Sequence, residues 1–330
     1  MTSSSPPRGP VVGIDLGGTD IKAALVAADG TVVHSIRRAT HRERGPQAVV
    51  EAVADTAAAV VAENDERTGQ PLLAVGVVVA GLVDESAGVA AYSANLGWRD
   101  LPLRDLLGER LGLPVVLGHD VRAGAVAESR LGAGRGHDDF VFVALGTGIA
   151  AAHVRGDQVL RGHHYAAGEL GHLVVRRTGP RCGCGRRGCL EVLASASAIA
   201  RRYHRAVRPR DRDAKGASAE QVCRLAVAGD PVARRVWATA VAALADGLAA
   251  YTVLCDPGLI VLGGGVARAG ATLTDPLRSA LATRLAVADP PEVAIAQLGT
   301  QAGCRGAALL AFDRVAAGVA AFATQSEVAR

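Results

Sequence analysis

The chain of 330 residues carries a formal net charge of +4, with 49% hydrophobic and 21% charged residues. This length allows two domains, and the composition is ordinary for a globular enzyme. The small net charge does not indicate a nucleic-acid-binding protein, and the absence of any run of about 18 apolar residues predicts no membrane-spanning helix.

The first half of the chain predicts short strands joined by glycine turns, with Asp29-Gly30 as a hairpin signal. Aromatic residues make up only 3% of the chain, so Val, Leu, Ile and Ala must fill the core. The expected elements are a strand at 11–16, a turn at 17–20, strands at 21–27 and 31–36, a helix at 47–62, a strand at 73–79, a loop at 92–98, a strand at 115–118 and a helix at 121–131.

The second half opens with the same pattern of strand, glycine-threonine turn, strand, hairpin and strand. The expected elements are strands at 140–145, 149–154 and 158–160, helices at 190–206, 219–227 and 231–255, strands at 259–262 and 293–298, and a helix at 303–321. Two copies about 130 residues apart predict a duplicated unit, one per domain. This α/β arrangement, with βββαβα units, is similar to the two-domain actin, hexokinase and Hsp70 (ribonuclease H-like) fold.

Three of the six cysteines fall within eight residues, just downstream of a histidine. Thiolates and imidazole suit Zn²⁺, and four such ligands close a structural site. The spacing therefore predicts a zinc site, with a loop of buried or disulfide-linked cysteines as the alternative. The expected ligands are His172, Cys182, Cys184 and Cys189.

A zinc ion in this loop would hold two carboxylates and an imidazole nitrogen in one place. Glu169 lies three residues before His172, and Glu191 follows the last cysteine by two. Such a set can bind several hydroxyl groups, as a sugar requires. The Gly-Glu-x-Gly-His and Cys-x-Cys-Gly-x-x-Gly-Cys-x-Glu pieces resemble the signature of the ROK family, which contains sugar kinases and repressors. The resemblance implies that the loop at 168–191 binds zinc and sugar.

Three glycine turns are candidates for binding nucleotide. Glycines let backbone N–H groups approach phosphate, and a carboxylate at a strand end can hold Mg²⁺. The alternatives are a plain hairpin turn for the first and a tight strand-helix connection for the third. The residues are Asp15, Gly17, Gly18 and Thr19 in the first turn, Gly146, Thr147 and Gly148 in the second, and Gly263, Gly264 and Gly265 in the third.

Asp120 is the candidate catalytic residue. It stands where a buried strand ends and a helix begins, so a helix N-cap is the alternative role. The family resemblance implies that this Asp removes the proton from a sugar hydroxyl and contacts the sugar. The family usually has Asn where this chain has His119. This difference leaves the proposed base, Asp120, in place but changes the sugar contact expected at position 119.

Asn95 is a further candidate for binding sugar. Asn95-Leu96-x-Trp98 resembles the Asn-Leu-x-x-Trp element of the family, one residue shortened, and the Asn amide both donates and accepts hydrogen bonds. A turn-forming Asn is the alternative. The loop at 80–84 resembles the Gly/Pro-Gly-x-Val-Asp loop of the family. It has Ala80 at the first of these positions, so the proline of the family pattern is missing.

The resemblance implies an ATP-dependent kinase that phosphorylates a hexose, with glucose at its 6-hydroxyl as the first expectation. Asp120 would be the base, Mg²⁺ would accompany ATP, zinc would be structural, and the chain would form a homo-oligomer, dimer or tetramer. Other acceptors, namely N-acetylmannosamine, fructose, allose or an amino sugar, remain open. So does a non-catalytic sugar sensor, although the roughly ten residues before the first strand leave no room for the DNA-binding domain of family repressors.

The expected domain plan is a disordered tail at 1–10, an N-terminal domain at 11–118 and a C-terminal domain at 119–303. The family resemblance implies that a last helix, about 304–330, packs back on the first domain. The remaining cysteines, Cys223, Cys255 and Cys304, stand in apolar surroundings and are expected in the core. Without a secretory signal, a reducing, cytoplasmic location is expected. A basic run at 201–215 is interpreted as a solvated helix end and loop.

Overall fold

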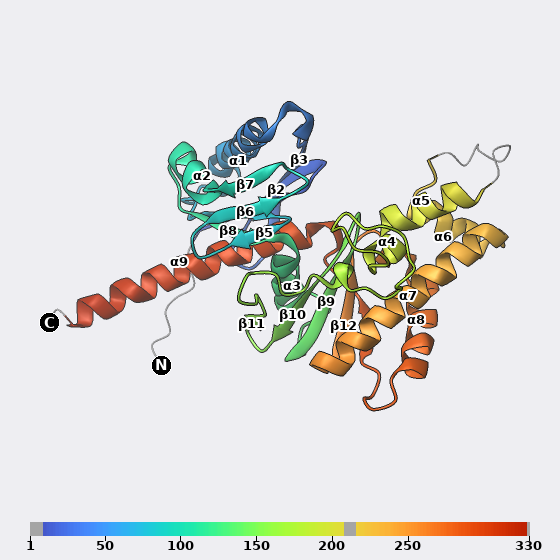
Figure 1. Cartoon of the computed structure of the whole chain (residues 1–330). Coiled ribbons are helices and arrows are strands. Elements are labelled where there is room, and N and C mark those ends of the chain that lie inside the picture. The colour runs from blue at the N-terminus through green and yellow to red at the C-terminus, as the bar shows by residue number, and fades with distance from the viewer. Residues whose placement is uncertain (1–8, 208–215, 329–330) are drawn as a thin grey trace. The chain divides into compact units, whose positions relative to one another are not determined.

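A computed structural model of the chain describes residues 9–207 and 216–328 (Figure 1). It divides into two compact units, one that ends at Ala127 and resumes at Thr300, and a second at Glu128–Gly299. The divisions expected after residues 118 and 303 lie near these boundaries, the first of which falls within helix α3 (Asp120–Leu131). Most of the tail expected at 1–10 and half of the basic run at 201–215 lie outside the described residues.

The first unit is built on a five-stranded sheet with the order β3-β2-β1-β4-β8. Strands β1, β4 and β8 are parallel, and β2 and β3 continue the sheet as antiparallel hairpins. The valines of β4 make that strand fully buried, as a central strand requires. The bounds are β1 Val11–Leu16, β2 Asp20–Val26, β3 Val32–Ala39, β4 Val75–Val79 and β8 Val115–His119.

Two helices and a small second sheet complete this part of the first unit. Helix α1 (Pro46–Thr68) begins with a proline at its first turn and ends at Gly69 in the left-handed region, and α2 is Leu103–Leu111. The small antiparallel sheet has the order β5-β6-β7, with β5 Leu82–Asp84, β6 Val89–Ser93 and β7 Trp98–Leu101. The loop expected at 92–98 is therefore wrong in part, since its ends belong to β6 and β7 and only 94–97 form the hairpin turn.

Helix α9 (Ala302–Val328) packs against β1, β4 and β8 of the large sheet in the first unit, and Figure 1 shows it below β8. Glycines on the strands allow this close approach. A Cβ at Gly13 would overlap the carbonyl oxygen of Cys304, and a Cβ at Gly76 would overlap that of Ala307. Gly13 and Gly76 are register partners on neighbouring strands. Together they leave a surface without side chains, on which the backbone of the helix packs.

The second unit repeats the topology, with a five-stranded sheet in the order β11-β10-β9-β12-β13. Strands β9, β12 and β13 are parallel, and β10 and β11 are antiparallel hairpin strands. This is the duplicated unit that the sequence predicts. The bounds are β9 Asp139–Leu145, β10 Ile149–Arg155, β11 Gln158–Val159, β12 Leu259–Gly263 and β13 Glu292–Ile295.

Helices of the second unit pack together and cover the sheet. They are α4 Glu191–Ala194, α5 Ala196–Ala206, α6 Ala219–Val227, α7 Pro231–Cys255 and α8 Ala271–Arg284. The single helix expected at 190–206 is split, because Ser195 has an extended backbone and its side chain caps α5 at the N–H of Ala198. Short 3-10 turns are found at Arg42–Arg44, Leu170–His172, Val266–Ala269 and Gly299–Gln301.

Among the described helices, α7 is long and apolar enough to cross a membrane by length and composition. It contacts α4, α5, α6 and α8, and half of its most apolar window is buried. This is the pattern of a core helix in a globular domain. Cys223 and Cys304 are buried as expected, whereas Cys255, at the end of α7, is only partly buried.

Candidate active site

The first glycine turn joins β1 to β2 at the carboxyl end of β1. The N–H of Gly17 donates to the carbonyl of Asp20 at 2.9 Å, and the Thr40 hydroxyl donates to the Gly17 carbonyl at 2.7 Å. These bonds fix the turn while Thr19 stays exposed. The turn therefore presents backbone and hydroxyl groups from a rigid support, as an anion-binding turn does.

Asp15, near the end of β1, is paired with Lys22 of β2 at 2.9 Å. Burial raises the pKa of Asp15, and the charge and hydrogen bond of Lys22 oppose that shift. The negative charge of Asp120 raises the pKa further, so the two carboxylates belong to one electrostatic site. Two carboxylates beside one ammonium group suit a site that accepts a divalent cation.

Asp120 begins α3 directly after β8. Because β1, β4 and β8 are parallel, Asp120 and the first glycine turn lie at the same edge of the sheet. The Asp120 Oδ1 atom accepts the N–H of Val121 at 2.7 Å, and the side chain is 30% exposed. Burial raises the pKa of Asp120, against the opposing effects of the Val121 N–H and the Arg122 charge. A fixed carboxylate with a raised pKa is suited to accepting a proton.

Asn95 is exposed on the turn between β6 and β7. Its Cβ lies in van der Waals range of Gly18, at 3.6 Å from where a Cβ on that glycine would stand. The structure thus brings Asn95, which was assigned to sugar, beside the first glycine turn, which was assigned to phosphate. A side chain larger than hydrogen at Gly18 would narrow the space between Asn95 and the first glycine turn.

The second and third glycine turns lie side by side in the second unit. Gly263 ends β12 as the register partner of Ala144 in β9, so both turns emerge at the carboxyl edge of the sheet. Gly264 has a φ of +84°, and a Cβ there would overlap the backbone of Leu145. Only glycine permits this conformation and approach without strain. Thr147, Gly264 and Gly265 are exposed, so the two turns can receive a ligand.

Glu191 connects the cysteine loop to the second glycine turn. Its Oε2 atom accepts the N–H of Ile149 at 3.1 Å, and a Cβ at Gly148 would overlap the same oxygen. One carboxylate oxygen is therefore held at the start of β10. Sequence reasoning assigned Glu191 to sugar and Gly148 to nucleotide without expecting this contact.

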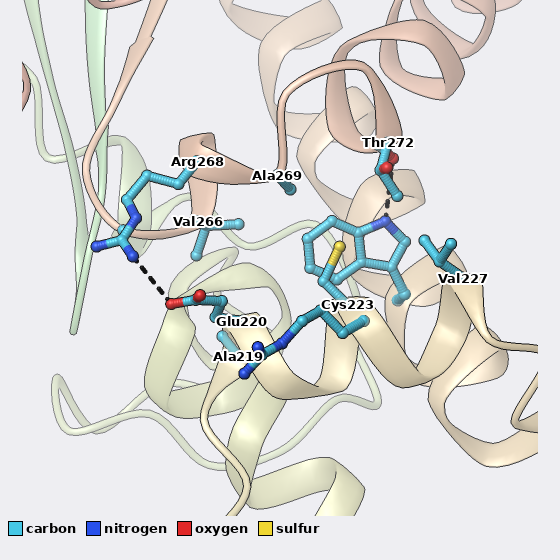
Figure 2. A pocket seen from close by; sticks show the side chains of 11 residues that line it. Ala219, Glu220, Cys223, Val227, Val266, Arg268, Ala269 and Thr272 are labelled. Carbon is cyan, nitrogen blue, oxygen red and sulfur yellow. Dashed lines mark hydrogen bonds and ion pairs between the residues drawn. The ribbon is translucent and has the colours of Figure 1, made fainter.

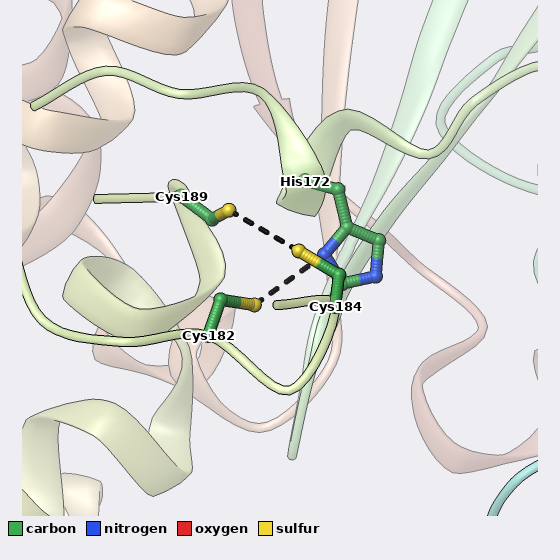
Figure 3. A group of neighbouring side chains, drawn as sticks. All are labelled: His172, Cys182, Cys184 and Cys189. Carbon is green, nitrogen blue, oxygen red and sulfur yellow. Dashed lines mark hydrogen bonds between the residues drawn. The ribbon is translucent and has the colours of Figure 1, made fainter. Parts of the chain in front are cut away.

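Four potential metal ligands converge in the loop, as Figure 3 shows. The ligand atoms of His172, Cys182, Cys184 and Cys189 all lie within 4.8 Å of one another. Cys184 Sγ is 3.6 Å from Cys189 Sγ, and Cys182 Sγ is 3.6 Å from His172 Nδ1. Ligand atoms on a tetrahedral zinc, with bonds of about 2.0–2.3 Å, lie about 3.5–3.8 Å apart. The donor set and its spacing fit that ion.

The other nitrogen of His172 faces a carboxylate, since Nε2 is 3.8 Å from Glu169 Oε2. Metal on Nδ1 would leave the proton on Nε2, directed at Glu169. Both residues belong to a loop that lies directly on β10, where a Cβ at Gly168 or Gly171 would overlap the backbone of the strand. The glycines of this motif therefore bring Glu169 and His172 close to the sheet, and both side chains are more than one third exposed.

The five residues expected to bind sugar are divided between the two units. Asn95 and Asp120 belong to the first, and Glu169, His172 and Glu191 belong to the second. In the first unit Asp120 lies at the carboxyl edge of the large sheet and Asn95 lies beside Gly18. In the second unit the loop of Glu169 and His172 lies against β10, where Glu191 accepts the N–H of Ile149.

A cavity of about 430 Å³ opens beside the third glycine turn (Figure 2). Trp237 of α7 forms part of its wall and donates its ring N–H to the carbonyl of Thr272 at 3.2 Å. At one side Arg268 pairs with Glu220 at 3.0 Å. The cavity is lined by Ala219, Glu220, Cys223, Arg224, Val227, Trp237, Gly265, Val266, Arg268, Ala269 and Thr272.

Sequence reasoning missed this cavity, apart from Gly265. Its residues come from three helices and a 3-10 turn, and none of them forms a local motif. The only signal was that Trp237 is one of two tryptophans in the chain. A cavity of this size with an aromatic wall and a few polar groups is typical of a small-molecule site.

Comparison with known proteins agrees with this geometry. A family model described as ROK family matches residues 11–314. The chain is 35% identical to a glucokinase of Thermotoga maritima, over 94% of this chain and 99% of that protein. It is 34% identical, with a TM-score of 0.79, to a ROK family glucokinase of Streptomyces griseus solved with glucose and AMPPNP, over 92% of this chain and 99% of that one.

A ROK hexokinase of Thermus thermophilus is 37% identical with a TM-score of 0.78, over 93% of this chain and 99% of that one. The family match extends over both units and includes the cysteine loop and all three glycine turns. Because the family model covers most of the chain and full-length relatives exceed 30% identity, this chain belongs to the ROK family.

Proposed function

We propose that this protein is an ATP-dependent sugar kinase that phosphorylates a hexose, with glucose at its 6-hydroxyl as the first candidate. The observation that carries the proposal is the position of Asp120, at the same sheet edge as the first glycine turn and within electrostatic reach of Asp15. A proton acceptor beside a phosphate-type turn is what transfer to an alcohol requires. The glucokinase relatives support the same reaction.

In the proposed reaction Asp120 takes the proton of the sugar hydroxyl. A bond forms between that oxygen and the γ-phosphorus, and the bond to the leaving ADP oxygen breaks. Backbone N–H groups of the glycine turns would neutralise charge on the phosphoryl group, and Mg²⁺ bound with ATP would supply further positive charge. Asp15 is the protein carboxylate suited to hold that ion, directly or through water.

Sugar recognition is assigned to both units. Asn95 and Asp120 would contact hydroxyl groups from the first unit. Glu169, His172 and Glu191 would do so from the second, where the carboxylate of Glu169 is 43% exposed. Zinc on His172, Cys182, Cys184 and Cys189 would hold this loop in place without touching the substrate, because a four-ligand site is closed.

The cavity beside the third glycine turn is the proposed place of the adenine base. Its wall offers the Trp237 ring and apolar side chains, and its volume of about 430 Å³ is within the usual range for ligand sites. The turn at 263–265 and the turn at 146–148 would carry the phosphates.

A different hexose is the second candidate. His119 stands where the family usually has Asn, next to the proposed base, so the hydroxyl pattern that the site accepts can differ from that of glucose. A coupled assay of the purified protein with a panel of hexoses decides between the candidates, with ATP–Mg²⁺ and polyphosphate as donors. Sugar-dependent ADP release supports the proposal, and no turnover of any hexose with either donor refutes it.

The proposed setting is a cytoplasmic homo-oligomer, either dimer or tetramer. Three cysteines that would have to be reduced to bind zinc favour a reducing compartment. Light scattering of the purified protein measures the oligomeric state directly.

A further inference from the structure

The first turn of α3 donates two backbone hydrogen bonds to neighbouring side chains. Asp120 Oδ1 accepts the N–H of Val121 at 2.7 Å, and His119 Nδ1 accepts the N–H of Arg122 at 3.3 Å. The first N–H groups of a helix have no backbone acceptor within the helix and need such partners. His119 therefore acts as the N-cap, a role that Asn, Asp and Ser usually take.

A histidine can cap a helix only through a nitrogen that carries a lone pair. With Nδ1 accepting, the ring proton of the neutral imidazole must sit on Nε2. His119 is 7% exposed as the last residue of β8. Burial and the charge of Arg122 lower the pKa of His119 to about 3, against an opposing effect of Glu85, so the ring stays neutral. The surroundings thus favour the form that capping requires.

A buried ion pair holds the same junction from the other side. Arg122 Nε donates to Glu85 Oε1 at 3.0 Å, and the two side chains are only 4% and 14% exposed. The same oxygen accepts the backbone N–H of His119 at 3.4 Å. Glu85 thereby links the end of β8 to the first turn of α3, the two segments that meet at Asp120.

The capping nitrogen lies beside the proposed catalytic carboxylate. His119 Nδ1 is 3.5 Å from Asp120 Oδ1, so the carboxylate is an acceptor next to the one that the Arg122 N–H uses. Asp is itself among the best capping residues. Without an acceptor at position 119, the carboxylate would be drawn toward the helix and away from a substrate.

We propose that His119 is a positioning residue, whose Nδ1 caps α3 and so keeps the Asp120 carboxylate directed at the sugar hydroxyl, with the Glu85–Arg122 pair fixing the junction. This inference rests on the proposed role of Asp120 as the base. Asn also caps well, so His119→Asn preserves the function, whereas His119→Ala removes the acceptor. Within this chain, the histidine performs the capping that an Asn at the same position would perform.

The test compares steady-state kinetics of the two variants, using the best hexose from the coupled assay. His119→Ala lowers kcat by about 10–100-fold, because small displacements of a catalytic group have effects of that size. The KM for ATP stays unchanged, and His119→Asn restores kcat to within about threefold of wild type. His137→Ala, at an exposed turn, is the matched control and behaves as wild type.

A double variant separates positioning from other effects. If His119 works through Asp120, adding His119→Ala to Asp120→Asn lowers kcat by less than about twofold further. Additive losses overturn the inference, and so does a raised sugar KM with normal kcat, which would make His119 a sugar ligand. If Asp120→Asn keeps high activity, the proposed base fails; if it is inactive while His119→Ala is normal, only this inference fails.

Two further measurements keep the test decisive if His119→Ala does not fold. His119→Leu keeps the bulk of the side chain without an acceptor and should give the same fall in kcat. In the wild-type protein, ¹⁵N NMR of labelled histidine should show Nδ1 of His119 unprotonated and Nε2 protonated. A proton on Nδ1 would remove the cap and overturn the inference.

Discussion

The Oε2 atom of Glu191 accepts a hydrogen bond of 3.1 Å from the backbone N–H of Ile149. This bond ties the end of the cysteine loop to the first residue after the second glycine turn. Gly148 leaves the space that the carboxylate occupies, since a Cβ there would overlap Oε2. The proposed sugar-binding loop and a proposed phosphate-binding turn therefore share one contact.

Gly148→Ala should raise the KM for sugar, because the added methyl group displaces the Glu191 carboxylate. A hydrogen bond to a charged group contributes about 1.5–3 kcal/mol, so a rise of about tenfold or more is expected. Gly108→Ala, on α2 of the first unit, is the matched control, since the nearest atom to its Cβ would be 3.8 Å away. An unchanged sugar KM in Gly148→Ala would separate Glu191 from sugar binding.

Metal analysis of the purified protein should give about one zinc per chain, as one tetrahedral four-ligand site implies. Cys184→Ser should lower the zinc content and raise the sugar KM, because metal binding and local folding are coupled. Cys255→Ser, at a partly buried position outside the cluster, is the control and should keep its zinc. Fully active protein without zinc would end the zinc assignment.

Glu169→Ala should raise the KM for sugar by about tenfold or more and leave the KM for ATP unchanged, because a carboxylate–hydroxyl bond is lost. Glu292→Ala, an exposed carboxylate on β13, is the control with the same change of charge. The two KM values are measured in one coupled assay. A rise in the ATP KM instead would reverse the assignment of the two substrates.

Ala269→Phe should block the cavity beside the third glycine turn, because the ring fills space that the base would occupy. The expected result is a rise of about tenfold or more in the KM for ATP, with the sugar KM within about twofold. Ala238→Phe, in an apolar surface hollow of the same unit, provides a control for added bulk. Normal ATP affinity in Ala269→Phe would place the base elsewhere.

Much of the fold could be predicted from the sequence because its signals are local. The buried strand at 11–16 and the helices at 219–227 and 231–255 have the predicted bounds, and the repeated strand-turn-strand pattern predicts the topology of both sheets. The β6–β7 hairpin was missed because Ala90 and Ala91 give no clear alternation. The helix predicted at 190–206 includes Ser195 in its interior, whereas in the structure Ser195 is the N-cap of α5.

In the candidate site, too, the sequence predicts the local features but not the contacts between residues far apart in the chain. The cysteine cluster could be predicted because spacing alone brings its ligands together, and the structure shows them within reach of one ion. The contact between Glu191 and Ile149 joins residues 42 apart in sequence, and no spacing rule anticipates it. The capping role of His119 depends on which ring nitrogen faces Arg122, which only coordinates reveal.

The central claim is that Asp120 accepts a proton from a sugar hydroxyl. Because burial raises the pKa of Asp120, the acid limb of kcat/KM should lie above the ordinary Asp value of about 3.9, with activity lost as pH falls through the raised pKa. Asp120→Asn keeps the shape of the side chain, and its amide oxygen can still accept the N–H of Val121, so stability and zinc content should be preserved.

The most direct test is the kcat of Asp120→Asn for sugar-dependent release of ADP from ATP–Mg²⁺, measured beside the wild type. A positioned general base contributes about 10²–10⁴-fold, so the account predicts a fall in kcat of that size in a folded protein. A variant that turns over sugar at more than roughly a tenth of the wild-type rate would contradict it.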